Sequence, residues 1–485
     1  MKTDTPQTIY LKDYRQPDYH ISKTHLTFHL GDNETLVEGR FEVVQTENGE
    51  AGAPLLLDGA ELELRSVKVD GQDVDKSRLT FGHETLSIAD VPATFILETQ
   101  VAIDPENNTS LEGLYRSSTM FCTQCEAQGF RKITYYIDRP DNLATFTTVI
   151  IADGTTFPIA LSNGNLVSEE KLDNGLVKTT WEDPYPKPSY LFALVAGDLE
   201  YIEDRYVTTS GRDVTLRIYV EEQNITKCDH AMLALKQSME WDEQRFNLEY
   251  DLDIYMIVAV NDFNFGAMEN KGLNIFNSKY VLARIDTATD SDFEGIQGVV
   301  GHEYFHNWSG NRVTCRDWFQ LSLKEGLTVF RDQEFSADLN SRSIKRIDDV
   351  NQLRTFQFPE DAGPMSHPIR PASYIEINNF YTVTIYEKGA EVIRMLHTIL
   401  GEEGFQKGVA LYFQRHDGQA VTTDDWLSAM EDANDVNLTQ FKNWYSQSGT
   451  PEVAVTWSHS PSDNSWSITA KQSCPPTPGQ NEKSD

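Results

Sequence analysis

The stretch VVGHEYFHNWSGNR, residues 299–312, places two histidines four positions apart, with a glutamate directly after the first. Residues four apart share one face of a helix, so the side chains of His302 and His306 can reach a single metal ion. Glu303 is rotated away from that face by one position, where it can act as general base on a bound water. The alternative is a pair of ordinary, partly buried helix histidines with a chance acidic neighbour.

A hydrolytic zinc site needs a third protein ligand, and His-His-Glu is one of its known sets. HEYFH is followed by eighteen residues and then by Glu325, at the predicted start of another helix. Ser322 and Glu325 also have capping-box spacing, so this glutamate has a competing role as a helix cap. The same spacing in Ser291 and Glu294 predicts the start of the histidine-bearing helix.

Composition and charge restrict the classes of protein. The chain has 485 residues, 39% of them hydrophobic, which is enough for about three domains with real cores. Its formal net charge of −34 excludes nucleic acid as a default partner, because phosphates are repelled. An acidic cleft would instead favour cationic ligands.

Cysteine usage and the apolar pattern indicate a cytoplasmic protein. The five cysteines are an odd number without framework spacing, so reduced thiols are the simplest interpretation. Cys122 and Cys125 form a single C-x-x-C, for which a redox role is the alternative. The polar start predicts no signal peptide, and no apolar stretch has the 18 or more residues of a membrane span.

The apolar pattern predicts three regions. Residues 1–198 show short alternating segments and a turn signal at Asp70-Gly71, and predict an all-β domain. Residues 199–449 mix strands with helical periods, such as the helix 229–246 and the buried strand 254–260, and predict an α+β domain.

Residues 450–485 form the third region. Alternation over 453–457 and 466–468 predicts a hairpin. A lone hairpin is not independently stable, so we expect an incomplete β-domain with exposed apolar surface.

Two further motifs carry a resemblance to a known family. FGAMENKGLNIFNSKYVL, residues 265–282, contains the G-A-M-E-N sequence, and LKEGLTVFRDQEF, residues 323–335, follows the histidine motif. Together with HEYFH they resemble the gluzincin peptidases, and within them the bacterial subgroup of zinc aminopeptidases related to aminopeptidase N. The resemblance implies a thermolysin-like catalytic domain and one Zn²⁺ per chain, held by His302, His306 and Glu325, with Glu303 activating water.

The resemblance also implies roles for residues that pattern alone would leave as surface acids or core aromatics. Glu269 and Glu126 would hold the free α-ammonium group of the substrate, and Tyr386 would stabilise the oxyanion. The backbone of the G-A-M-E-N strand would pair with the peptide, and the side chain of Gln124 would line the pocket for the first residue of the substrate. The remaining substrate-binding candidates are Gly266, Ala267, Met268 and Asn270 in the motif.

The implied function is zinc-dependent release of the N-terminal residue from peptides with a free amine, by a monomeric cytoplasmic enzyme with no nucleic-acid or membrane partner. Full members of the family continue through a small β-domain and a large helical domain, so this chain is expected to be C-terminally truncated. Two alternatives stay open: an endopeptidase on the same scaffold, and a catalytically weak or silent peptide-binding fragment. Residue preference at the cleaved position is not fixed by the sequence.

Overall fold

The computed structural model describes residues 7–31 and 34–484. The chain divides into two compact units. The β-rich unit comprises Arg15–Asp317 and His416–Val421, and the helical unit comprises Met1–Tyr14, Trp318–Arg415 and Thr422–Asp485. These units divide the chain at other points than the three predicted domains, whose boundaries stay a prediction.

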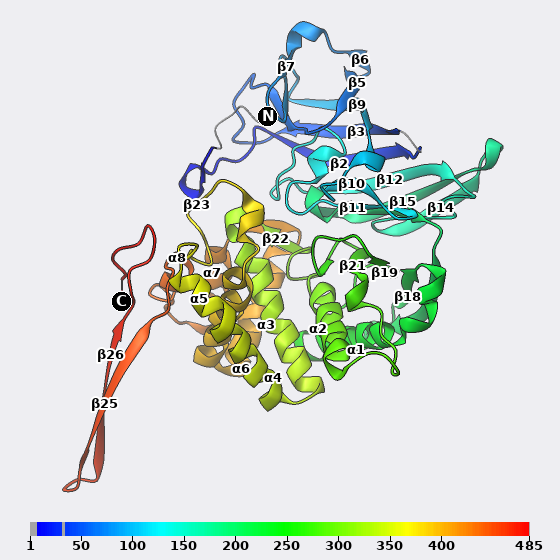
Figure 1. Ribbon diagram of the computed structural model, residues 1–485. Coiled ribbons are helices and arrows are strands. Elements are labelled where there is room, and N and C mark those ends of the chain that lie inside the picture. Colours follow the sequence, from blue (N-terminus) through cyan, green and yellow to red (C-terminus); the bar gives the residue numbers. More distant parts are fainter. Residues whose placement is uncertain (1–6, 32–33, 485) are drawn as a thin grey trace. The chain divides into compact units, whose positions relative to one another are not determined.

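The β-rich unit begins with an eight-stranded sheet of order β14-β15-β12-β2-β3-β9-β5-β6, antiparallel except between β12 and β2 (Figure 1). The predicted turn at Asp70-Gly71 joins β5 to β6, and both turn residues have the positive φ that a tight hairpin turn requires. The strands are β2 (Tyr19–His29), β3 (Thr35–Gln45), β5 (Glu63–Val69), β6 (Gln72–Asp73), β9 (Thr94–Ile103), β12 (Ala144–Asp153), β14 (Asn165–Lys171) and β15 (Leu176–Lys187).

Two smaller sheets accompany it, and the all-β prediction for this region is confirmed. A core of interlocking aromatic rings, among them Phe28, Phe130, Phe146 and Phe192, is almost fully buried. One sheet has the order β10 (Gly113–Ser117), β11 (Met120–Gln124), β16 (Leu194–Gly197), β13 (Ile159–Ser162), and the other β4 (Leu55–Asp58), β8 (Thr85–Ile88), β7 (Leu79–Phe81).

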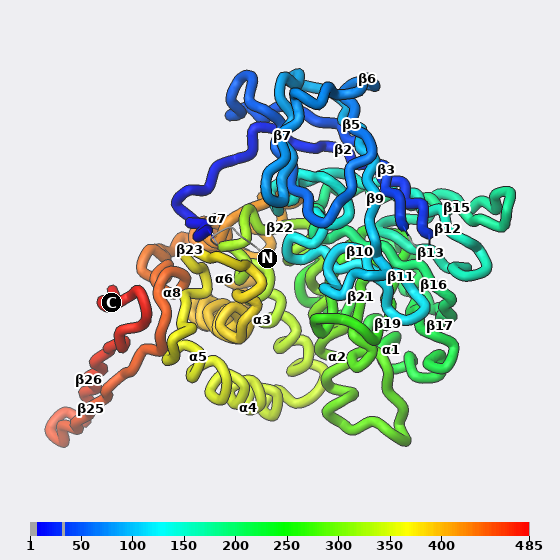
Figure 2. Tube along the Cα trace, turned by 45° about the horizontal axis from the view of Figure 1, so that its top comes forward, coloured from blue at the N-terminus to red at the C-terminus, as the bar shows by residue number. Residues whose placement is uncertain are grey.

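The rest of this unit is α+β, as predicted. Its five-stranded sheet has the order β17 (Glu200–Val207), β18 (Asp213–Val220), β19 (Ile254–Val260), β21 (Leu273–Asn277), β20 (Ala267–Met268). Helices α1 (Asp229–Phe246) and α2 (Asp290–Phe305) lie side by side (Figures 1 and 2), and a short parallel pair joins β22 (Val313–Cys315) to β24 (Gln419–Val421). The capping prediction for α2 was wrong: Thr289 and Asp292 form the capping box, and Ser291 lies inside the helix.

The helical unit contains most of the helices. They are α3 (Leu321–Leu339), α4 (Arg342–Gln352), α5 (Phe358–Ala362), α6 (Gly389–His416), α7 (Thr423–Asn434) and α8 (Asn443–Ser446). Two π-helical turns, η10 (Leu353–Gln357) and η12 (Thr384–Lys388), precede α5 and α6. A two-residue pairing joins β1 (Ile9–Tyr10) to β23 (Ser373–Tyr374). Within residues 7–31 and 34–484, every helix is too short or too polar to cross a membrane.

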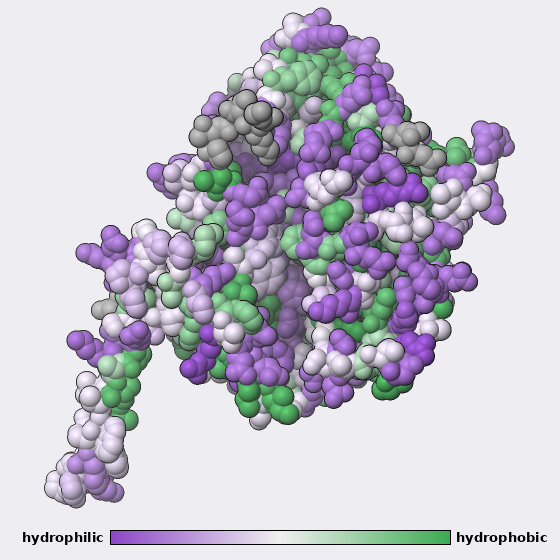
Figure 3. Space-filling model, in the orientation of Figure 1, coloured by the Kyte–Doolittle hydropathy of each residue, from purple (hydrophilic) through white to green (hydrophobic). Residues whose placement is uncertain are grey.

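A two-stranded hairpin, β25 (Glu452–Ser460) and β26 (Ser465–Ser473), extends from the helical unit (Figure 1). Its side chains are exposed on both faces, with Trp457 at 69% and Ile468 at 71% of their full accessible surface. Figure 3 shows apolar surface along this hairpin. The predicted hairpin and its exposed apolar residues are both confirmed.

Candidate metal centre

Helix α2 presents its two histidines as a pair. The helix ends at Phe305, and His306 sits at its C-cap, where its backbone N–H still bonds to the carbonyl of His302. The two Nε2 atoms are 3.0 Å apart, and Nδ1 of the almost fully buried His306 lies 2.8 Å from the carbonyl oxygen of Ser309. That carbonyl fixes the proton on Nδ1, so the Nε2 lone pair of His306 is available to a metal.

Glu303 is buried beside this pair. Ligand atoms of Glu303, Glu269 and His306 lie within 4.8 Å of one another. On strand β19, burial raises the pKa of Tyr255 well above its ordinary value, and the charges of Glu303 and Glu269 add to the effect. Tyr255 therefore stays protonated and donates its hydroxyl hydrogen to the side-chain oxygen of Asn274.

Glu325 projects from the first turns of α3 and is not a helix cap. The helix begins at Leu321 after Gln320 without any side-chain cap, so Ser322 lies inside it and the competing capping-box interpretation is wrong. The Glu325 carboxylate is buried and accepts a hydrogen bond of 2.6 Å from Lys324 Nζ.

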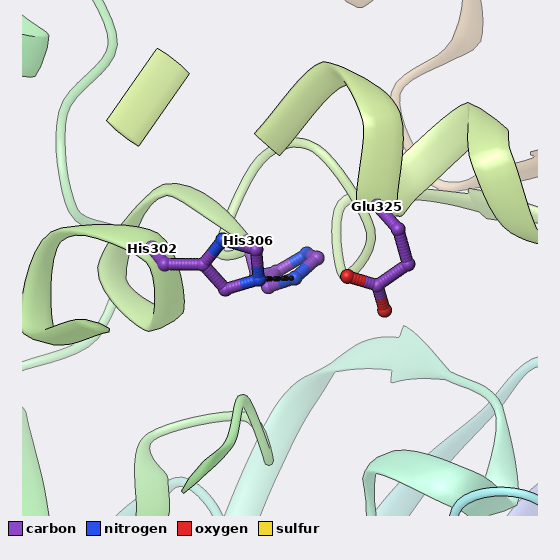
Figure 4. A group of neighbouring side chains, drawn as sticks. All are labelled: His302, His306 and Glu325. Atoms are coloured by element: carbon purple, nitrogen blue, oxygen red, sulfur yellow. Dashed lines mark hydrogen bonds between the residues drawn. The ribbon is translucent and has the colours of Figure 1, made fainter. Parts of the chain in front are cut away.

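Figure 4 shows the side chains of His302 and His306 from α2 and of Glu325 from α3 as neighbours, and a ligand atom of each lies within 4.8 Å of the others. Two imidazoles and one carboxylate with this proximity fit the donor set of a hydrolytic zinc site. The Nδ1 contact of His306 supports the fit, because zinc-binding histidines are oriented in this way by a partner on their other ring nitrogen.

A buried ionic network holds the turn after His306. Lys271 Nζ donates to both oxygens of Asp251, at 2.5 and 2.6 Å, and to Asn307 Oδ1 at 2.8 Å. Arg312 donates to the same Asp251 carboxylate at 2.7 Å and bridges to Asp417. Burial alone would raise the pKa of Asp251, but the Lys271 and Arg312 charges lower it overall, so the carboxylate stays ionised. The network thus ties the G-A-M-E-N segment to the histidine motif.

Replacing Asp251 by Asn is expected to lower the free energy of unfolding by about 3–5 kcal/mol, because Lys271 and Arg312 lose their buried counter-charge. The stabilisation is present above the ordinary carboxyl pKa of 3.8 and is lost as the pH falls through the lower native pKa. Urea unfolding at pH 7 measures the loss. The control is Asp213→Asn, whose partner Arg205 is exposed, with an expected change within about 1 kcal/mol; equal losses would contradict the prediction.

The G-A-M-E-N motif forms an edge strand. Strand β20 is the last strand of its sheet, with Ala267 opposite Phe276 and Met268 opposite Ile275. The carbonyl of Gly266 accepts a hydrogen bond of 2.9 Å from the backbone of Asn277. An edge strand is the element to which an extended peptide can add.

Two buried acids of the β-rich unit converge beside this strand. Carboxylate oxygens of Glu126 and Glu269 lie within 4.8 Å of each other, and both residues are 5% exposed or less. Asn311 Nδ2 donates to the backbone carbonyl of Glu269 at 2.9 Å, and Gln124 Nε2 donates to that of Glu126 at 2.9 Å. The side chain of Asn270, next in the motif, is fully buried.

Tyr386 lies in the π-helical turn η12 and is partly exposed. The turn leads into α6 at Gly389, which packs against Gly326 of α3; a Cβ on Gly326 would lie 2.8 Å from the carbonyl carbon of Gly389. Only glycine permits backbones to approach this closely. Residues 325 and 386 are therefore carried by two segments in direct backbone contact.

Several of these residues were not predicted from the sequence. Lys271 and Asn307 stand directly after the two motifs, and that adjacency was the available signal. Asp251, Asn311 and Tyr255 have no local signal, because their roles depend on contacts between distant segments.

Two regions of the chain match models of known protein families. Residues 16–191 match the peptidase M1 N-terminal domain, and residues 230–445 match the peptidase family M1 domain. The chain belongs to peptidase family M1.

Within that family, the chain is similar to bacterial aminopeptidases N. It is 58% identical to aminopeptidase N of Escherichia coli (strain K12) over 99% of this chain and 55% of the relative, and 56% identical to that of Haemophilus influenzae over 98% and 54%. The crystal structure of Legionella pneumophila aminopeptidase A in complex with aspartic acid superposes with a TM-score of 0.91 at 36% identity, covering 96% of this chain and 54% of that one. The chain thus spans about half the length of these relatives.

Proposed function

We propose that the chain is a zinc-dependent aminopeptidase that releases the N-terminal residue of peptides by attack of an activated water. The observation that carries the proposal is the combination of a His-His-Glu donor set with two further buried acids, Glu126 and Glu269. The donor set supports metal-assisted hydrolysis, and the acid pair supports recognition of a cationic group next to it.

His302, His306 and Glu325 would hold the zinc ion. Bound zinc supplies Lewis acidity that polarises a carbonyl oxygen and favours ionisation of water near neutral pH. Glu303, one helix position from His302 and buried, would accept the proton of the attacking water and deliver it to the leaving amine. Because Tyr255 stays protonated, it does not compete with Glu303 as a base.

Substrate recognition would use the β-rich unit. Glu269 and Glu126 would accept hydrogen bonds from the α-ammonium group, which sets the cleavage point one residue from the end. The backbone of Gly266 and Ala267 would pair with the peptide, with Met268 and Asn270 completing the motif and Gln124 lining the pocket for the first side chain. The Tyr386 hydroxyl would donate to the developing oxyanion.

The test compares a free with an acetylated amine. Aminoacyl 4-nitroanilides should be cleaved and their N-acetyl forms should not, because acetylation removes the charge that Glu269 and Glu126 would bind. Glu269→Gln is expected to lower kcat/KM for the free amine about 10²-fold, since a buried charge pair loses one partner. Cleavage of acetylated or internal bonds would indicate the endopeptidase alternative. If the protein binds peptides but releases no amino acid, the alternative of a catalytically silent peptide-binding fragment would be indicated.

The cellular setting belongs to the same proposal. We propose a cytoplasmic, monomeric enzyme acting on peptides, and the cytoplasmic setting is supported by five cysteines that are all free thiols in the structure. The division into domains at residues 1–198, 199–449 and 450–485 is proposed on the sequence pattern.

A further inference from the structure

The turn that carries Tyr386 is held at both ends by the same short helix. Residues 384–388 form a π-helical turn, and a second π-turn at 353–357 runs directly into α5. A π-turn is less regular than an α-helix and persists where neighbouring groups hold it, which occurs often at functional sites. In this unit those groups are two consecutive carboxylates of α5, Glu360 and Asp361.

Glu360 binds the beginning of the turn. Its Oε2 accepts a hydrogen bond of 2.9 Å from the backbone N–H of Thr384 and another from the Thr384 hydroxyl. Thr384 is fully buried, whereas Glu360 is partly exposed. Gln357 donates to the same hydroxyl oxygen at 3.3 Å. The start of the turn is therefore fixed two residues before Tyr386.

Asp361 binds the end of the turn. Lys388 Nζ donates to Asp361 Oδ2 at 2.6 Å and to the carbonyl of Gly449 at 3.0 Å. The other carboxylate oxygen accepts from the backbone N–H of Gly449 at 2.6 Å and from Ser366. Burial alone would raise the pKa of Asp361, but the Lys388 charge and these hydrogen bonds lower it overall, so the Asp361 carboxylate stays ionised.

The third constraint is the contact of Gly389 with Gly326 described above, which sets the end of the turn against the helix of Glu325. The backbone of residues 384–389 is thus held at three points. Thr384 is bound by Glu360, Lys388 by Asp361, and Gly389 packs against Gly326. The backbone that carries Tyr386 is therefore fixed relative to the helix that carries Glu325.

We propose that Glu360 and Asp361 are positioning residues that hold Tyr386 at its working place through the turn 384–388. The inference rests on the role given to Tyr386 in the proposed function. A displacement of about 1 Å of a catalytic group can cost 10²-fold in rate, so loss of either anchor should lower kcat while leaving ground-state binding, and hence KM, largely unchanged.

The experiment tests the hydrogen bonds between Glu360 and Thr384. Glu360→Gln removes the charged acceptor, Thr384→Val removes the hydroxyl donor, and Thr384→Ser keeps that hydroxyl. The first two are expected to lower kcat about 10-fold or more, with zinc content and KM maintained, and Thr384→Ser should retain most of the parent's kcat. The matched control is Asp425→Asn on α7, where the carboxylate accepts from the backbone N–H and hydroxyl of Thr422 in the same pattern. This control should leave kcat unchanged.

A double-mutant test separates positioning from general destabilisation. In a Tyr386→Phe background, Glu360→Gln should change kcat by less than about two-fold, because the group on which it acts is already gone. An equal loss in both backgrounds would overturn the proposal.

Hydrogen exchange provides a readout that needs neither zinc nor turnover. Glu360→Gln should speed amide exchange in a peptide covering residues 382–390, and Asp425→Asn should not. Unchanged exchange in this peptide would overturn the inference even if the enzyme is active. If Tyr386→Phe keeps full activity while exchange responds as expected, the fault lies in the role assigned to Tyr386 in the proposed function, and the catalytic part of the inference falls with it.

Discussion

Replacing Glu303 by Gln is expected to lower kcat by about 10²–10⁴-fold, the usual contribution of a positioned general base. The amide keeps the size of the side chain but cannot accept the proton of the attacking water. Because Glu303 is not among the three proposed metal ligands, zinc content should stay at one ion per chain. Release of 4-nitroaniline at saturating substrate, together with metal analysis, measures both quantities.

The matched control for this change is Glu294→Gln, an exposed glutamate on the same helix. It removes the same charge from α2 and should leave kcat within about two-fold, as for other surface substitutions. A Glu303→Gln enzyme as active as its parent would show that another group removes the proton.

Replacing His306 by Ala is expected to abolish zinc binding and with it measurable turnover. Two ligands of the proposed three would remain, and the Nδ1 contact with Ser309 would be lost as well. Metal analysis after dialysis gives the direct answer. Added zinc should raise the melting temperature of the chelator-treated parent, since a ligand at 1,000 times its Kd stabilises by about 4 kcal/mol, and should not raise that of the variant.

His230→Ala is the control for this second change. His230 is a half-buried helix histidine of the same unit whose Nε2 also contacts a backbone carbonyl, that of Phe293 at 2.8 Å. Its loss should leave zinc content unaltered. Retention of zinc by the His306 variant, or equal loss in both, would contradict the proposed ligand set.

Strongly periodic segments were predictable from the sequence. The helix at 229–246 and the strand at 254–260 have the predicted bounds, because sustained apolar periods of 3.6 residues or a continuous buried run leave little choice of structure. The proximity of His302 and His306 followed from helix geometry alone. That of Glu325 was predicted from its donor type and its spacing after the histidines, although a helix cap stayed open as the alternative role.

The sequence did not predict the first residue of α2 correctly, because two capping patterns overlap there. Thr289-x-x-Asp292 and Ser291-x-x-Glu294 both satisfy the capping pattern, and the chain uses the earlier one, one residue before the first helical position. The sequence could not choose between them because both supply a hydroxyl and an acid at the same spacing.

Contacts between distant segments were beyond the sequence altogether. Asp251 lies 56 positions before Asn307, and Glu360 lies 24 before Thr384, so no window along the chain contains both partners. The π-turns were equally hidden, since their residues also suit an ordinary α-helix. Such features depend on tertiary packing, which overrides local preference.

The hairpin β25–β26 has a consequence for the behaviour of the protein in solution. A two-stranded ribbon presents unpaired strand edges, and this one adds tryptophans and aliphatic side chains, so it can template pairing with another chain. The net charge of −34 opposes such encounters by mutual repulsion between molecules. Electrolyte shortens the range of that repulsion to about 10 Å at 0.1 M, so colloidal stability declines as ionic strength increases.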